Sequence, residues 1–332
     1  MHLAAPILSM LSPPGFRRGW RIALTLIGLG LLMSGCALRP LPAHLPLPDT
    51  AKGGQLHGLL VDMRTLRIVT FEAMITDAIQ AQLITIGEEH YHPDIQAFER
   101  KTLNAIAQKR PRQTALAMEF LERDAQPAVD AYLAGEIDPD ALHQRLKASA
   151  AFQKGYTPLI EAARQAQLPT LAMNLPRRIA RQIARKGLKL TQDELDPTDQ
   201  AYWPNPIPAI PERYRTYFLD QVSQHHQVKG EQAQHFTEAS FLKDVTMAAT
   251  LADFLTEHPH TTILAIAGRF HVDYGIAIPA LFEHHQPQAR IRRITTRSIP
   301  ARERLDLRQL QQDGVADYIH FFPPRPSAPP SQ

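Results

Sequence analysis

Short apolar runs alternate with stretches of helical periodicity along most of the chain, and this alternation constrains the fold more than any other feature. Runs of strand length are predicted at 57–62, 66–70, 82–86, 114–118, 169–173, 262–267 and 289–296. Helices are predicted between them at 71–80, 94–110, 125–153, 157–167, 176–187 and 275–285. Because strands that alternate with helices favour right-handed crossovers, we expect an α/β fold with a mainly parallel sheet flanked by helices.

The main domain is predicted to span 53–322 and to carry helical insertions. The stretches at about 121–155 and 190–258 are too long for single crossover helices. They are therefore predicted to form a smaller helical subdomain inserted into the α/β domain. The last ten residues, 323–332, contain five prolines and no apolar run, which predicts a disordered tail.

The N-terminal segment has the pattern of an export signal. Three arginines precede an apolar run at 22–32, and small residues then lead to Cys36. A basic stretch, an apolar core of about 7–15 residues and small residues at the cut are typical of a signal peptide. The ending resembles the lipobox of bacterial lipoproteins, so we expect 1–35 to be removed and Cys36 to carry lipid such as palmitate. The alternative is a short N-terminal anchor helix.

Cys36 is the only cysteine of the chain, so no internal disulfide can form and packing alone must hold the fold in an oxidising compartment. The following residues to position 52 are rich in proline and predict an extended tether on the membrane. Ala37 follows the cysteine where an aspartate would favour the inner membrane, so we expect the outer membrane. The formal charge of +3 equals the three signal arginines, which leaves the mature chain neutral and argues against nucleic acid as a partner.

Polar residues follow four of the predicted strands, each at the point where the strand ends. Glu88 and His90 come after the first of these strands, Glu119 after the second, Asn174 after the third and His271 after the fourth. In an open parallel sheet, ligands bind beyond the carboxyl ends of the strands. We therefore expect these five side chains to share one site.

Each residue also has a structural interpretation that the sequence leaves open. Glu88 and Glu119 are placed where carboxylates cap the next helix. Asn174 precedes Pro176 and fits ordinary turn chemistry. A lone His271 is more often a buried, hydrogen-bonded histidine than a ligand.

The same residues resemble the ChaN family of haem-binding lipoproteins, a branch of the Tiki-like superfamily. The resemblance runs from about 58 to 297, and its marks are the segments 87–90 (GEEH), 117–120 (AMEF), 124–130 (DAQPAVD), 156–159 (YTPL), 172–176 (AMNLP) and 267–271 (AGRFH). It implies a large α/β domain with a small helical domain that binds haem. It also implies a role in iron or haem acquisition, with a homodimer and an outer-membrane haem receptor as partners, and a binding protein rather than an enzyme.

The resemblance further implies that a tyrosine holds the haem iron while histidine assists at the propionates. Tyr156 matches a family position and is the first choice as iron ligand, followed by Tyr91 and Tyr274. Arg177 lies near the candidate site in sequence and is assigned to the propionates together with its neighbours. Apolar surface for the porphyrin is expected from Phe120, Phe152, Met173 and Phe270, and further cationic charge from Arg178 and Arg269.

The alternative is a hydrolase of the metal-dependent peptidase or erythromycin esterase type, which related branches of the superfamily resemble. Glu88, His90, Glu119 and His271 would then hold a divalent metal such as zinc and leave one position open for water. The metal would lower the pKa of that water, and a remaining carboxylate would act as general base.

Overall fold

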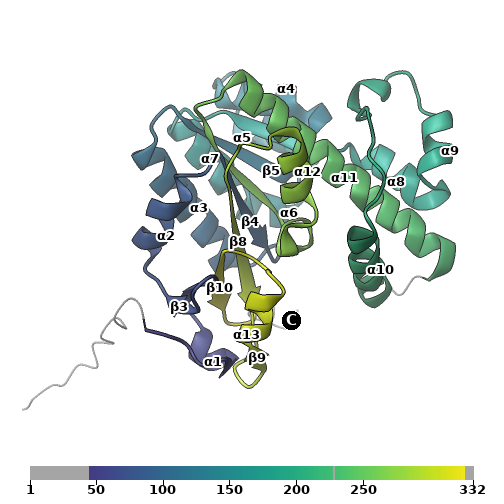
Figure 1. Cartoon of the computed structure of the whole chain (residues 1–332). Helices are drawn as coiled ribbons and strands as arrows, with labels where there is room; N and C mark the ends of the chain where they lie inside the picture. The colour runs from purple at the N-terminus through teal and green to yellow at the C-terminus, as the bar shows by residue number, and fades with distance from the viewer. Residues whose placement is uncertain (1–44, 227–228, 326–332) are drawn as a thin grey trace, which may run out of the picture. The chain divides into compact units, whose positions relative to one another are not determined.

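The computed structural model describes residues 45–226 and 229–325, shown in colour in Figure 1. The predicted signal peptide, Cys36 and most of the predicted tether lie outside these residues, as does most of the predicted disordered tail. Within the part that is described, no helix is both long and apolar enough to cross a membrane.

An eight-stranded, mostly parallel sheet forms the centre of the fold, in the order β3-β2-β10-β8-β4-β7-β5-β6. The six strands from β10 to β6 run parallel, and β2 and β3 join antiparallel at the edge next to β10. In chain order the strands are β2 (Leu60–Asp62), β3 (Arg67–Ile68), β4 (Leu83–Glu88), β5 (Thr114–Glu122), β6 (Thr170–Asn174), β7 (Thr262–Gly268), β8 (Ile291–Ser298) and β10 (Tyr318–Phe322). The predicted α/β class is confirmed.

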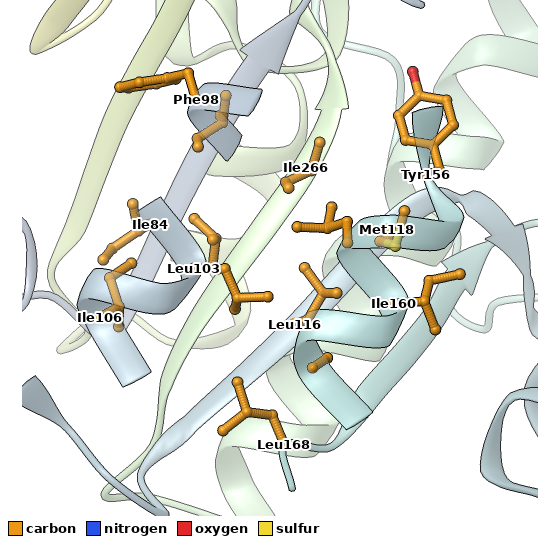
Figure 2. Packing of buried hydrophobic residues seen from close by; sticks show 14 of the residues in the cluster. Ile84, Phe98, Leu103, Ile106, Leu116, Met118, Tyr156, Ile160, Leu168 and Ile266 are labelled. Atoms are coloured by element: carbon orange, nitrogen blue, oxygen red, sulfur yellow. The ribbon is translucent and has the colours of Figure 1, made fainter. Parts of the chain in front are cut away.

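Alternate residues of each central strand enter different cores, because side chains of a strand point to opposite faces. Ile84 and Ile86 face one core, while Leu83 faces the other. Figure 2 shows part of the first core, in which Met118 of β5 and Ile266 of β7 meet side chains of α3 and α7. Each aliphatic side chain buried in this way contributes roughly 1.5–3 kcal/mol of hydrophobic stabilisation.

Helices cover both faces of the sheet. The first core is closed by α2 (Phe71–Ala78), α3 (Pro93–Lys109), α4 (Gln126–Leu133), α5 (Pro139–Leu146), α6 (Ala150–Gly155) and α7 (Thr157–Gln165). The second is closed by the C-terminal half of α11 (Gly230–Glu257) and by α12 (Ile278–His285). Three further helices, α8 (Arg177–Lys186), α9 (Leu188–Asp193) and α10 (Glu212–His226), pack along α11 beside the sheet (Figure 1).

The sequence did not predict the elements after position 296 or the pairing of residues 45–52 with the domain. The strand β10 lies inside the sheet between β2 and β8, although the sequence predicted no strand after position 296. Residues 45–52, predicted as tether, contact the domain instead: Pro46 bridges to Arg67, and β1 (Thr50–Lys52) pairs with β9 (Arg304–Asp306). The predicted tether is therefore too long at its C-terminal end. Its boundary was wrong because Leu47 and Ala51 pack against a hydrophobic cluster that includes Val61 and Phe321, a surface that exists only in the folded domain.

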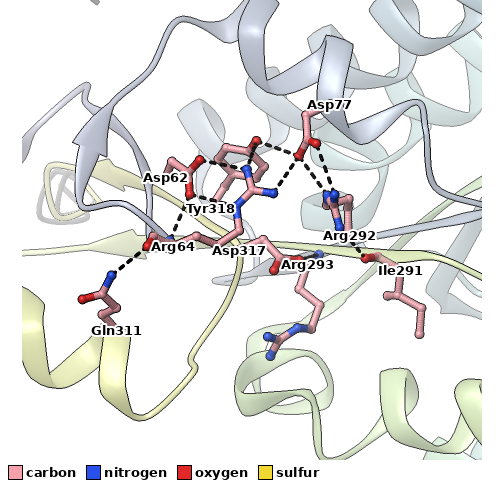
Figure 3. Close-up of polar contacts among 9 residues, drawn as sticks. All are labelled: Asp62, Arg64, Asp77, Ile291, Arg292, Arg293, Gln311, Asp317 and Tyr318. Atoms are coloured by element: carbon pink, nitrogen blue, oxygen red, sulfur yellow. Dashed lines mark hydrogen bonds and ion pairs between the residues drawn. The ribbon is translucent and has the colours of Figure 1, made fainter. Parts of the chain in front are cut away.

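A polar network joins α2 to the sheet, as Figure 3 shows. The carboxylate of Asp77 accepts hydrogen bonds from Arg292 at 2.8 Å and from the hydroxyl of Tyr318 at 2.7 Å, and Arg64 lies 3.2 Å away. Burial opposes the charge of Asp77, but these donors outweigh it and lower the pKa of the carboxyl to about 2. The network thus ties β2, β8 and β10 to one helix.

The burial of His320 on β10 predicts how the free energy of unfolding depends on pH. Its ring packs on Phe98 and Phe322, and burial lowers its pKa to about 4. In the unfolded chain the imidazole binds a proton near pH 6.5, whereas the folded protein resists protonation until about pH 4. The free energy of unfolding therefore falls as pH decreases from about 6.5 to about 4. We expect His320→Gln to recover on the order of 2–3 kcal/mol of that loss, measured by urea unfolding at pH 7.5 and pH 4.5.

The control for this measurement is His284→Gln, because the side chain of His284 is exposed at the end of α12. This variant should keep the pH dependence of the unmodified protein. An unchanged pH dependence in His320→Gln would show that burial of His320 does not limit stability in acid.

Candidate functional site

The carboxyl ends of β4, β5, β6 and β7 meet at one edge of the sheet. The parallel register pairs Glu88 at the end of β4 with Gly268 at the end of β7. The register of β5 against β6 shifts between Met118 and Glu122, and Glu119 lies within this irregular segment. The structure thereby brings together the candidate residues that follow each strand.

Glu119 is buried, and both of its oxygens have donors. Its Oε2 accepts the backbone N–H of Gly268 at 2.7 Å, and its Oε1 accepts Lys243 Nζ at 2.9 Å. His271 Nε2 lies 3.3 Å from the same Oε1. Burial would raise the pKa of Glu119, but the charges of His271 and Lys243 outweigh it and hold the pKa well below its usual range.

His271 lies between two carboxylates. Its Nδ1 is 2.7 Å from Asp244 Oδ1, and the hydroxyl of Tyr214 donates to Asp244 Oδ2 at 2.6 Å. Burial opposes protonation of His271, but Asp244 and Glu119 outweigh it and raise its pKa to about 9. Both ring nitrogens of His271 therefore face carboxylates, an arrangement that favours the protonated imidazolium.

Glu88 accepts two hydrogen bonds on one oxygen. The hydroxyl of Tyr156 donates to Glu88 Oε1 at 2.5 Å, and His90 Nδ1 lies 2.9 Å from the same atom. Tyr156 is fully buried, and burial together with the Glu88 carboxylate raises the pKa of its phenol far above the ordinary value. His90 keeps 45% of its side chain exposed, and although desolvation opposes its charge, Glu88 and Glu119 raise its pKa.

Glu99 of α3 is a second buried carboxyl beside Glu88. Burial and the negative charge of Glu88 raise the pKa of Glu99 well above its ordinary value. Neither oxygen of Glu99 nor Oε2 of Glu88 has a donor among the described residues while both groups are ionised. A proton on Glu99 supplies that donor, so we interpret the pair as one carboxylic acid bonded to one carboxylate.

Gly268 allows these groups to approach each other. A Cβ built at this position would lie 2.8 Å from Cε1 of His90 and 3.4 Å from Oε2 of Glu119. The first distance is too short for a real Cβ contact, so any larger residue at the end of β7 would have to displace the ring of His90.

The predicted divalent-metal set does not fit this geometry. Glu119 and His271 are bonded to each other and to further protein groups, and His90 directs Nδ1 at Glu88. No group of three or more metal-ligating side chains suited to a metal ion occurs within 45–226 and 229–325. Two of the four predicted donors, Glu119 and His271, are thus already engaged in ion pairs with each other and with Lys243 and Asp244.

A pocket of about 580 Å³ opens beside the strand ends. Tyr91, Phe120 and Phe152 provide aromatic surface, and Phe120 stacks on Tyr156 with ring centroids 4.0 Å apart. Charged residues also line the pocket. They come from the end of β5 and the turn after it, from the end of α5 and the residue after it, and from α8: Glu122, Asp124, Arg145, Lys147, Arg177, Arg178 and Arg181. Its volume lies within the range of ligand pockets, roughly 300–1,000 Å³.

The remaining candidates fall in different places. Tyr91 lines the pocket, and its backbone has a φ of 62°, a left-handed conformation that is unusual for a tyrosine. Arg177 also lines the pocket and forms an ion pair with Glu122. Asn174 donates to the backbone carbonyl of Glu119 at 2.9 Å, which is a structural role. Tyr274 borders a separate pocket of about 480 Å³.

Three expected wall and rim residues lie elsewhere. Met173 is fully buried in the second core, on the other face of the sheet. Phe270 packs near Tyr217, and Arg269 lies over the ring of Phe270. Neither Phe270 nor Arg269 lines the 580 Å³ pocket, because the short 3₁₀ turn η3 (Arg269–His271) carries them away from it.

Sequence reasoning missed Glu99, Asp244, Lys243 and Tyr214, although a signal for two of them was present. Glu99 is four residues after Ile95 and seven before Ile106, on the apolar stripe of α3. Asp244 is three residues after Phe241 and four before Ala248 on α11, in the same kind of position. A charged residue on the buried stripe of a helix is rarely buried without a partner, and this pattern marks both residues.

The model of the family described as haem-binding uptake, Tiki superfamily, ChaN matches residues 74–282. A solved structure of ChaN from Campylobacter jejuni, described as binding haem cofacially, superposes with a TM-score of 0.61 at 19% identity. The superposition covers 79% of this chain and 95% of that one.

A more distant likeness is to an erythromycin esterase in its open conformation, with a TM-score of 0.42 at 13% identity over 72% of this chain and 76% of that one. No curated protein matches the sequence. The family match spans more than half of the chain, and the likeness to the Campylobacter structure agrees with it in fold. The chain therefore belongs to the ChaN family of the Tiki superfamily.

Proposed function

We propose that this protein binds haem in the 580 Å³ pocket at the strand ends. The observation that carries the proposal is the composition of that pocket, which combines a wall of three aromatic side chains with several cationic ones. A porphyrin has a flat apolar body and two carboxylates, so these residue types match its chemistry. The family assignment gives haem as the ligand class.

Tyr91 is the tyrosine best placed to hold ferric iron. Its side chain lines the pocket, and its hydroxyl makes no hydrogen bond with the described residues. Tyr156 is a weaker candidate than the sequence suggested, because its hydroxyl donates to Glu88 and its raised pKa opposes formation of the phenolate that iron requires. A left-handed tyrosine backbone at a pocket wall fits a functional role, since backbone strain tends to collect at binding sites.

Haemin titration of the purified full-length protein tests this ligand. Tyr91→Phe should abolish the charge-transfer absorbance of a ferric phenolate and weaken binding by about tenfold or more. Tyr156→Phe should keep that absorbance. It should lower the free energy of unfolding by about 1–3 kcal/mol, because Glu88 loses a buried donor.

Each outcome of the titration decides something. If the absorbance is lost in Tyr156→Phe and kept in Tyr91→Phe, Tyr156 is the ligand and the assignment to Tyr91 is wrong. If the unmodified protein shows no saturable spectral change, haem binding itself is refuted. The stoichiometry of the unmodified protein also tests the homodimer that the sequence led us to expect.

We further propose that the protein is a lipoprotein of the outer membrane with a role in haem acquisition, as the N-terminal sequence and the family suggest. The support is the apolar run at 22–32 followed by Cys36, the only cysteine in the chain. A lipid on that residue would tether the haem-binding domain to a membrane, where an outer-membrane haem receptor would be its partner.

Fractionation of bacterial cells tests the anchor. Cys36→Ala should move the protein from the membrane to the soluble fraction or leave its precursor uncleaved, since no thiol remains for lipid attachment. Mass spectrometry of the N-terminal peptide gives an independent readout. An N-terminal peptide with unmodified Cys36 in the membrane-bound protein would contradict the proposed anchor.

A further inference from the structure

The pocket at the strand ends carries more positive charge than its own acids neutralise. Five basic and two acidic residues line it. Arg177 pairs with Glu122, with Nε 3.3 Å from Oε1, and Arg178 pairs with Asp124. Both acids of the lining are therefore used by two adjacent arginines at the start of α8.

The other three cations are Arg145, Lys147 and Arg181, which we call the free cations. Their side chains are exposed, and they form no hydrogen bond or ion pair with any residue of the described chain. They come from the end of α5, the residue after it and the second turn of α8. The excess charge of the pocket is thus localised on three side chains.

The backbone conformation at Lys147 does not itself favour a lysine. Lys147 ends α5 with a φ of 49° and ψ of 43°, in the left-handed conformation that favours glycine or asparagine at this place. Neither the turn nor a neighbouring acid accounts for a lysine side chain. A lysine at this place in the pocket lining is explained if the pocket binds an anion.

The free cations border the same space as Tyr91, Phe120 and Phe152. A ligand that satisfies both sets is flat and apolar in its body and carries more than one negative group at its edge. On the basis of the proposed function, we propose that Arg145, Lys147 and Arg181 bind the propionates of haem and that the pocket selects tetrapyrroles with free carboxylates. Arg177 and Arg178, assigned to this role from sequence, are held by Glu122, Asp124 and Asp199.

Charged side chains on a helix are often only solvated, so the experiment needs a matched cation outside the pocket. Arg185 provides it, because it is exposed on α8 one turn after Arg181 and does not line the pocket. Arg185→Gln removes the same charge from the same helix. A difference in haemin affinity between Arg181→Gln and Arg185→Gln therefore results from the position of the charge in the pocket and not from the net charge of the protein.

The experiment titrates the full-length protein with haemin and with haemin dimethyl ester, whose propionates are uncharged. The unmodified protein should bind haemin about tenfold more tightly than the ester. Arg181→Gln and Lys147→Gln should each weaken haemin binding about three- to tenfold. Added salt should weaken haemin binding more in the unmodified protein than in either variant. Neither variant should change the affinity for the ester, and Arg185→Gln should change neither affinity.

The outcomes separate this inference from the proposed function. Equal affinity of the unmodified protein for haemin and the ester keeps haem binding and overturns propionate recognition. An equal loss in Arg185→Gln and Arg181→Gln also overturns it, because the effect is then one of net charge. Binding of neither compound overturns the proposed function and the propionate assignment together. Iron-free protoporphyrin IX should keep its dependence on Arg181, since that contact does not involve the metal.

Discussion

The carboxylate of Glu119 joins three parts of the fold at the site. It extends from the end of β5, accepts the backbone N–H of Gly268 at the end of β7, and accepts Lys243 from α11. Through His271 it also reaches the pair of Asp244 and Tyr214. A buried charge is tolerated only when it is paired and hydrogen-bonded, so this set of contacts must form together. The position of the strand ends, and with them the pocket beside them, depends on it.

A division of roles follows from this arrangement. The polar residues at the strand ends that attract attention in the sequence are largely internal to the protein, where their charges neutralise one another. Glu88, Glu119 and His271 are buried, and their bonding capacity is directed at other side chains. The surface available to a ligand comes from residues outside this buried polar group, among them Tyr91 and Phe120, which line the pocket.

The sequence predicts the central strands because their signal is local: an apolar run of strand length followed by a helical period. It also predicts that their ends converge, since parallel strands place their carboxyl ends on one edge. It does not predict β10, whose place between β2 and β8 depends on partners far away in the chain. The availability of a side chain is equally non-local. Whether Tyr156 is free to ligate depends on Glu88, and whether His271 is neutral depends on Asp244.

The left-handed backbone of Tyr91 lowers the stability of the fold, while its side chain contributes a phenol to the pocket wall. A non-glycine residue in this region costs roughly 1–2 kcal/mol, which glycine would avoid. Selection for thermal stability alone would therefore favour replacement at this position, and the replaced protein would lose the phenol from its pocket wall. The residue that a related chain carries at position 91 would therefore indicate whether stability or the phenol was favoured by selection. A chain that keeps a tyrosine there keeps a less stable backbone together with the phenol in its pocket wall.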